Sequence, residues 1–361
     1  MIRMGSVVAI GVFAAVLSVP GAAAPQGSSN ATGASPATTI VLPQKLVAGQ
    51  RATLAVLDAT GRLAPGVVVE FTGGERVSTD ATGRAGFTAP AEAGVLRAQL
   101  PGVEMSASTT IITPPPSPSN GVQVFDYPHV ISVSDRFAVY GSGFRGDAND
   151  DHAMLGGQSA LVLAASPVAL VLLPGPRAPE GTAQLLIEAG GRSAEPVQVT
   201  LVSIELSAVR NQLAPGEKGK LTVRLHGTGQ RLVIEVRNLT PEIIALPRGN
   251  LQRVTSSGGL VNSAPVELQG VRAGDFSISA KLVPGVTGLP DVEAARQYLM
   301  AARGLVTGEV QDRVDRIIRR IQRDPQDIKH VRADLEKMLA KQPVGEFGRL
   351  LEAAWRELLR R

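Results

Sequence analysis

Apolar side chains at every second position, in short runs separated by glycine-bearing turns, constrain the fold of this chain more than any other feature. Ala52, Leu54 and Val56 alternate with Thr53 and Ala55, and Asp58-Ala59-Thr60-Gly61 then supplies a turn. Alternation with a period of two gives a strand one apolar face, and turns roughly every ten residues are typical of β-sandwiches. We therefore predict a mainly β protein built from tandem immunoglobulin-like sandwiches.

The alternating pattern falls into three stretches, at residues 39–112, 121–203 and 204–286. Residues 24–38 are small and polar, which predicts a disordered linker. Residues 113–120 are rich in proline, which predicts a stiff, extended linker. We expect one sandwich per stretch, the third of a general immunoglobulin or fibronectin type, and we expect each sandwich to fill its own thin core.

The C-terminal residues 287–361 have a different pattern, with apolar residues at intervals of three and four. Such spacing places the apolar side chains on one stripe of a helix, which needs a partner surface to cover it. Four amphipathic helices in succession most simply cover one another, so we predict a small helical domain. The stripe expected for the second helix consists of Val310, Val314, Ile317, Ile318 and Ile321.

The first stretch carries turn residues of a known type, namely Val56-Leu57-Asp58 followed by Gly61, then Pro65-Gly66-Val67 and a closing Ala93-Gly94. In these residues it resembles the bacterial Ig-like domains of the invasin/intimin type. The resemblance implies a β-sandwich and assigns no site.

The second stretch contains Pro128–Val133, Gly141-Ser142-Gly143-Phe144 and Gly156-Gly157-Gln158-Ser159-Ala160. In these residues it resembles an IPT/TIG domain. That family is an Ig-like sandwich found in cell-surface receptors, some transcription factors and many bacterial surface or carbohydrate-active proteins, so it implies a fold and leaves function open. We expect the two glycines to allow a sharp bend and Phe144 to close one end of the core.

The N-terminus is typical of a secretory signal peptide at residues 1–23. Arg3 supplies the positive charge, Val7–Val19 the apolar segment and Ala22-Ala23 a site for cleavage. We expect an exported protein, either periplasmic, cell-surface or extracellular, without a stable membrane span after cleavage. An uncleaved anchor is the alternative. The lack of cysteine excludes disulfides and zinc sites built from thiolates.

Charge and motifs argue against nucleic-acid binding and catalysis. Lys and Arg outnumber Asp and Glu by 36 to 32, and the helical tail at 288–361 holds 15 basic and 12 acidic residues. Nucleic-acid binding requires a patch of one sign with aromatic residues, and neither is evident. There is no G-x-S-x-G or H-E-x-x-H motif, and the four histidines are scattered. We expect a non-enzyme without a cofactor, although a pair of carboxylates brought together by the fold stays open.

A weak calcium candidate lies in the acidic segment after Phe144. Asp147, Asn149 and Asp151 repeat the D-x-N-x-D opening of a calcium loop. His152 occupies the position that requires glycine, and Gln158 the position that requires a bidentate carboxylate. An EF-hand is therefore excluded, and the choice lies between a looser calcium site and an ordinary solvated turn.

The second helix of the tail is rich in arginine. Glu309–Arg313, Asp312–Arg316 and Asp315–Arg319 are acid-before-base pairs four residues apart, a spacing that stabilises an exposed helix. A solvated face is therefore the simplest interpretation, and a helix that docks a partner is the alternative. The interaction candidates under that alternative are Arg313, Arg316, Arg320 and Trp355.

These observations favour a non-catalytic, exported modular protein that acts in protein–protein interaction, adhesion or assembly, with other exported or surface proteins as partners. The first alternative is a carbohydrate-binding accessory protein, a class that stacks sugars on exposed Trp and Tyr. The chain has one Trp and three Tyr, and only Tyr127 and Tyr140 fall in a predicted sandwich. A cryptic hydrolase is the least favoured interpretation.

Overall fold

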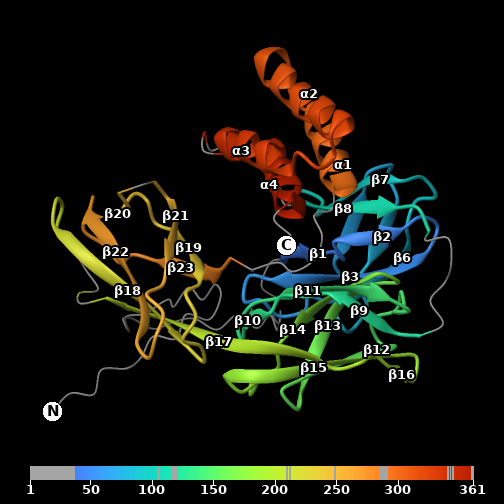
Figure 1. Cartoon of the computed structure of the whole chain (residues 1–361), viewed down its shortest axis with the longest axis horizontal. Coiled ribbons are helices and arrows are strands. Elements are labelled where there is room, and N and C mark those ends of the chain that lie inside the picture. Colours follow the sequence, from blue (N-terminus) through green and yellow to red (C-terminus); the bar gives the residue numbers. More distant parts are fainter. Residues whose placement is uncertain are drawn as a thin grey trace, which may run out of the picture.

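The computed structural model confirms a mainly β fold followed by a helical domain (Figure 1). The predicted signal peptide lies outside the described residues, as does most of the linker predicted at 24–38. The structure describes residues 37–103, 106–114, 121–208, 210, 213–247, 249–283, 292–339, 341, 343 and 345–358. In these ranges, no helix is both long enough and apolar enough to cross a membrane.

The first sandwich begins at Ala37, two residues inside the predicted linker. Its strands are β1 (Ala37–Val41), β2 (Lys45–Val47), β3 (Arg51–Asp58), β4 (Val68–Phe71), β5 (Arg76–Ser78), β6 (Arg84–Thr88), β7 (Gly94–Gln99) and β8 (Ser106–Ile112). One sheet joins β1, β3 and β6, and the other has the order β2-β8-β7-β4-β5. Between them lies a core that includes Leu54, Val69 and Phe87.

Two turns of the first sandwich share one construction. Asp58 Oδ1 accepts hydrogen bonds from the backbone N and Oγ1 of Thr60, at 2.8 and 2.7 Å. Asp80 Oδ1 accepts the same pair from Thr82, at 2.7 Å each. The hydroxyl bond of each threonine contributes most to lowering the pKa of its aspartate. The Asp-Ala-Thr-Gly segments are therefore turns, as predicted.

The second sandwich follows from residue 121. Its strands are β9 (Gln123–Asp126), β10 (Val130–Ser132), β11 (Phe137–Ser142), β12 (Asp151–Leu155), β13 (Gln158–Ser166), β14 (Ala169–Leu173), β15 (Gly181–Ala189), β16 (Arg192–Ser193) and β17 (Val197–Ala208). One sheet has the order β9-β11-β14-β13, and the other contains β12, β15, β17 and β10. Phe144 is buried in the core between them, as expected.

The third sandwich shares β17 with the second, so one strand crosses the boundary predicted at residue 203. Its remaining strands are β18 (Lys218–His226), β19 (Val233–Asn238), β20 (Ile244–Ala245), β21 (Leu251–Thr255), β22 (Asn262–Gly270) and β23 (Ile278–Leu282). One sheet has the order β20-β22-β18-β17, and the other β21-β19-β23. The domain limits given above stay predictions.

Each sandwich has its own core, as expected, but the first two sandwiches are also joined to each other, at a contact that we call the first joint. Thr53 of β3 and Ala165 of β13 are paired across the joint, and Val41, Leu57 and Leu163 lie in an additional apolar cluster there. The buried Arg84 guanidinium donates two hydrogen bonds, of 3.0 and 2.7 Å, to a carbonyl of β13. The reason is that β3 and β13 are buried on both faces, so the outer face of each is covered by the other sandwich.

The C-terminal helices are α1 (Val292–Arg303), α2 (Gly308–Arg323), α3 (Ile328–Leu339) and α4 (Gly345–Leu358). Their apolar stripes share one core, which contains Val314, Ile317, Ile318 and Ile321 of α2 as predicted. Val310 is exposed. Val95 of β7 packs against this core, so the helical domain folds back onto the first sandwich (Figure 1).

Candidate binding surfaces

An exposed row of side chains runs along the first strand of the second sandwich. From residue 123 to 129, exposed or half-exposed residues alternate with more deeply buried ones. The edge ladder, as we call it, consists of Gln123, Phe125, Tyr127 and His129. Of these, Tyr127 is half-buried and also packs against the core. Phe125 is 63% exposed, which is unusual for a large ring on a strand.

Close backbone contacts hold the edge ladder in place. β9 pairs with β11, and a Cβ added at Gly141 would lie 2.0 Å from the carbonyl oxygen of Gln123. A Cβ at Gly143, whose φ is +78°, would lie 2.3 Å from the carbonyl oxygen of Gly121. The glycines of the Gly-x-Gly-Phe segment therefore let β9 approach its neighbour, so they also position the ladder.

The ladder crosses the open edge of the sandwich. β9 belongs to one sheet and β10 to the other, and the carbonyl of His129 accepts a 2.7 Å hydrogen bond from the backbone N of Thr200. The rings of Tyr127 and His129 are 5.1 Å apart and nearly perpendicular. The side chains thus project from backbone that is fixed at both ends, over roughly 20 Å at the rise of a strand.

Sequence reasoning missed this surface, although its signal was present. The search for Trp and Tyr as sugar-stacking residues identified only Tyr127 and Tyr140 in the predicted sandwiches. Tyr140 is buried, and its hydroxyl is hydrogen-bonded to Gln44 of the first sandwich. Phe125 and His129 were not among the predicted site residues. The alternation of residues 123–129 is the signal that could have identified them, because it places both on the same side of the strand as Tyr127.

Of the three predicted calcium residues, Asp147 helps to fasten the first two sandwiches together. Asp147 Oδ2 is 3.1 Å from Arg51 Nη2, and its Oδ1 accepts bonds from the backbone N and Nδ2 of Asn149. Thr53 Oγ1 donates to the Gly146 carbonyl at 2.7 Å. Among the described residues, no three acidic or histidine side chains are close enough to hold a metal. The calcium site stays a prediction without geometric support.

Asp151 belongs to the base of the same loop and is buried. Its Oδ1 accepts a 3.0 Å bond from the backbone N of Arg145. Burial raises the pKa of Asp151 to about 7, and the neighbouring Asp150 and Asp147 add to the shift. Asp151 therefore closes the base of the loop through the backbone of Arg145.

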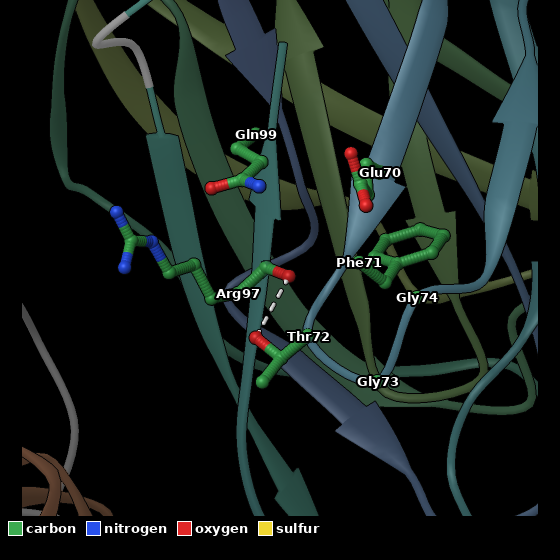
Figure 2. Close-up of a pocket in the computed structure, with 7 residues that line it drawn as sticks. All are labelled: Glu70, Phe71, Thr72, Gly73, Gly74, Arg97 and Gln99. Atoms are coloured by element: carbon green, nitrogen blue, oxygen red, sulfur yellow. Dashed lines mark hydrogen bonds between the residues drawn. The ribbon is translucent and has the colours of Figure 1, made fainter. Parts of the chain in front are cut away.

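A surface hollow of about 260 Å³ lies beside the turn between β4 and β5 (Figure 2). Glu70 is the one carboxylate that lines it, and Glu70 pairs with Arg76 at 3.5 Å. In Figure 2 the guanidinium of Arg97 points away from Glu70. Acid–base hydrolysis of a glycosidic bond normally needs two carboxylates, so this hollow does not provide that chemistry.

The four interaction candidates of the tail separate into two kinds. Arg313 and Arg316 lie on the open face of α2, beside Arg319, and all three line a hollow of about 290 Å³. Arg320 instead turns toward α3, where Nη1 is 2.6 Å from Asp334 Oδ2. Of the three predicted i,i+4 pairs, Glu309–Arg313 forms at 3.8 Å, whereas Asp315 pairs with Arg303 of α1.

Trp355 is buried within the helical domain, only 5% exposed. Its Nε1 donates to Glu336 at 3.2 Å, and the guanidinium of Arg253 in β21 lies 4.4 Å from its ring centre. Trp355 therefore joins the helical domain to the third sandwich. It is a buried contact within the chain and offers no free surface.

No family model and no curated protein matches the chain. The resemblances to invasin/intimin-type and IPT/TIG domains therefore stay predictions.

Similar solved structures include surface proteins. The Bacteroides ovatus SGBP-B of a mixed-linkage glucan utilization locus, in complex with a mixed-linkage heptasaccharide, is 10% identical, with 72% of this chain and 76% of that chain covered and a TM-score of 0.24. SGBP-B of a Bacteroides uniformis xyloglucan locus is 12% identical, with coverages of 68% and 97% and a TM-score of 0.26. The surface layer protein SbsC, domains 1–6, is 13% identical, with coverages of 70% and 39% and a TM-score of 0.17. At such scores these likenesses carry no argument about fold or function.

Proposed function

We propose that this chain is an exported, non-catalytic carbohydrate-binding protein whose ligand lies along the edge ladder. The single observation that carries the proposal is the row of exposed Gln123, Phe125 and His129, with the half-buried Tyr127 among them, on fixed backbone.

The chemistry of the ladder suits a sugar chain. The face of an aromatic ring carries negative potential and attracts the polarised C–H bonds of a sugar ring, so Phe125 is the expected stacking platform. The exposed Gln123 and His129 supply amide and imidazole groups for the sugar hydroxyls. The ladder is open along its length, which fits an extended oligosaccharide better than a small molecule held in a closed pocket.

A protein partner at the ladder is the competing function, and adhesion or assembly would follow from it. Stable protein interfaces bury on the order of 1,000 Å² or more around an apolar centre. The ladder is one strand wide and offers one large exposed ring, which is too little for such a centre. For this reason we place carbohydrate before protein as its ligand.

The test is binding of linear oligosaccharides, from tetrasaccharides to heptasaccharides of β-glucan, xylan, chitin and α-glucan, to the chain without its first 23 residues. We expect calorimetry to detect at least one class and Phe125→Ala to weaken its Kd at least tenfold, about 1.4 kcal/mol. Phe125→Tyr should bind nearly as well as the original chain. Leu161→Ala, an exposed apolar residue of β13, is the matched control. Failure of every class to bind, or equal binding by Phe125→Ala, would refute the proposal.

A further inference from the structure

The second helix of the tail presents a charged surface that the proposed carbohydrate site does not use. Its apolar stripe is buried against the other helices. Ion pairs close both flanks, because Arg303 of α1 pairs with Asp315 and Arg320 pairs with Asp334 of α3. In Figure 1, α2 stands on the side of the helical domain away from the sandwiches.

The remaining charges form the outward face of α2, which we define as Glu309, Asp312, Arg313, Arg316, Arg319 and Arg323. Its two carboxylates lie in the first half of the helix. Arg313 is 3.8 Å from Glu309. Within the described ranges, no carboxylate lies within 4.0 Å of Arg316, Arg319 or Arg323, and all three are exposed. The second half of this face is therefore uniformly basic.

We propose that the outward face of α2 docks an acidic segment of a partner protein. Carboxylates of that segment would meet Arg316, Arg319 and Arg323, whose guanidinium groups can each form two parallel hydrogen bonds with a carboxylate. Residues three and seven positions apart on a helix follow one side, so an acidic helix with carboxylates at the same spacing would match them. A basic residue of the partner would face Glu309 and Asp312.

The mixed charge of the face selects this occupant over others. An anionic lipid surface or a polyanion would press negative charge against Glu309 and Asp312 as well as against the arginines. The apolar stripe that a membrane-bound helix inserts into lipid is already buried here. A second copy of α2, placed antiparallel about Arg316, would pair Glu309 with Arg323 at the ends. It would also bring Arg316 against its own counterpart and Arg313 against Arg319, and like charges at the centre of a pair are unfavourable.

The test uses a fluorescein-labelled helical peptide with glutamates at i, i+3 and i+7 and one lysine beyond them, titrated with the full-length mature chain. We expect measurable binding that weakens as salt rises, because exposed charge pairs are screened. Arg316→Glu with Arg319→Glu should weaken binding at least tenfold. Arg177→Glu with Arg272→Glu makes the same change in net charge at exposed arginines of the second and third sandwiches and should leave binding within twofold.

Three results would overturn the proposal: equal loss of binding in both double variants, tighter binding to phosphatidylglycerol vesicles than to the peptide, or self-association of the chain through this face. If the glutamate variants fail to fold, Arg316→Gln with Arg319→Gln provides the same comparison at lower cost to the helix. Oligosaccharide binding should be unchanged in all of these variants, which keeps this test separate from that of the edge ladder.

Discussion

The two joints between the sandwiches are built in opposite ways. The first joint, between the first and second sandwiches, joins segments separated by a proline-rich stretch, yet it has an apolar cluster, paired strands and the hydrogen bonds of Arg84. The second joint has no linker, because β17 runs from the second sandwich into the third. The comparison teaches that the composition of a linker does not predict whether the modules it connects are independent.

The largest expected effect is the dependence of stability on pH caused by Asp151, which lies in the loop whose Asp147 contacts the first sandwich. The pKa of Asp151 is raised from 3.8 to about 7 in the folded chain. The unfolded chain therefore loses this proton at lower pH than the folded chain, so stability falls as pH rises from about 4 and reaches its lowest level above about 7. The full difference is about 4 kcal/mol.

Asp151→Asn should remove this dependence. Hydrogen exchange in urea, followed on peptides from each sandwich, would show the variant close to the original chain at pH 4 and more stable above pH 7 in the first two sandwiches. Glu195→Gln changes an exposed carboxylate of the second sandwich that does not contribute to the shift of Asp151, so this control should keep the original pH dependence. Parallel pH curves for Asp151→Asn and the original chain would contradict the buried position assigned to this carboxyl.

A smaller loss of stability is expected from alanine substitutions at glycines where the backbone is closely packed at each joint. A Cβ at Gly146 would lie 2.0 Å from the carbonyl oxygen of Arg51 across the first joint. A Cβ at Gly227, whose φ is +85°, would lie 2.3 Å from the carbonyl oxygen of Leu201 at the second. Each alanine substitution should cost about 1–3 kcal/mol.

Hydrogen exchange in urea, followed on peptides from each sandwich, shows at which joint each substitution lowers stability. Gly146→Ala should destabilise the first two sandwiches and spare the third, and Gly227→Ala should destabilise the second and third. Gly94→Ala, where an added Cβ has no atom within 4 Å, should have little effect. A uniform loss over the whole chain in either variant would mean that the joints are not separate units.

The smallest expected loss of stability follows from breaking the contact between the helical domain and the third sandwich. Arg253→Ala removes the guanidinium that lies over the Trp355 ring, a contact worth about 0.5–1 kcal/mol at a partly exposed site. Because Trp355 is the one tryptophan of the chain, its emission reports on this contact directly. We expect a red shift as water reaches the ring. Unchanged emission would place the third sandwich away from the helical domain.

Much of the fold could be predicted from local pattern. Alternation identified the strands, and the Asp-Ala-Thr-Gly segments identified turns that the aspartate side chains indeed close. The first joint could not be predicted in the same way. The runs at 52–57 and 161–165 are apolar on both faces, which shows that a second surface covers each strand but does not say which one.

The candidate surfaces were harder to predict, because exposure depends on tertiary packing. Arg320 and Trp355 resemble surface residues in sequence, yet one is paired with α3 and the other is buried beneath Arg253. Arg316 and Arg319 have acidic residues four positions earlier, yet neither forms an ion pair with a described carboxylate. The helix offers several partners to each charge, and only packing decides among them.

The claim that a sugar chain lies on the edge ladder is tested most directly by fluorine NMR of the chain labelled with 4-fluorophenylalanine. The resonance that disappears in Phe125→Leu assigns Phe125, whose ring is 63% exposed. We predict that adding the best-binding oligosaccharide shifts this resonance and leaves the buried phenylalanines unchanged. A bound oligosaccharide that leaves the Phe125 resonance in place, or shifts another one instead, would contradict the account.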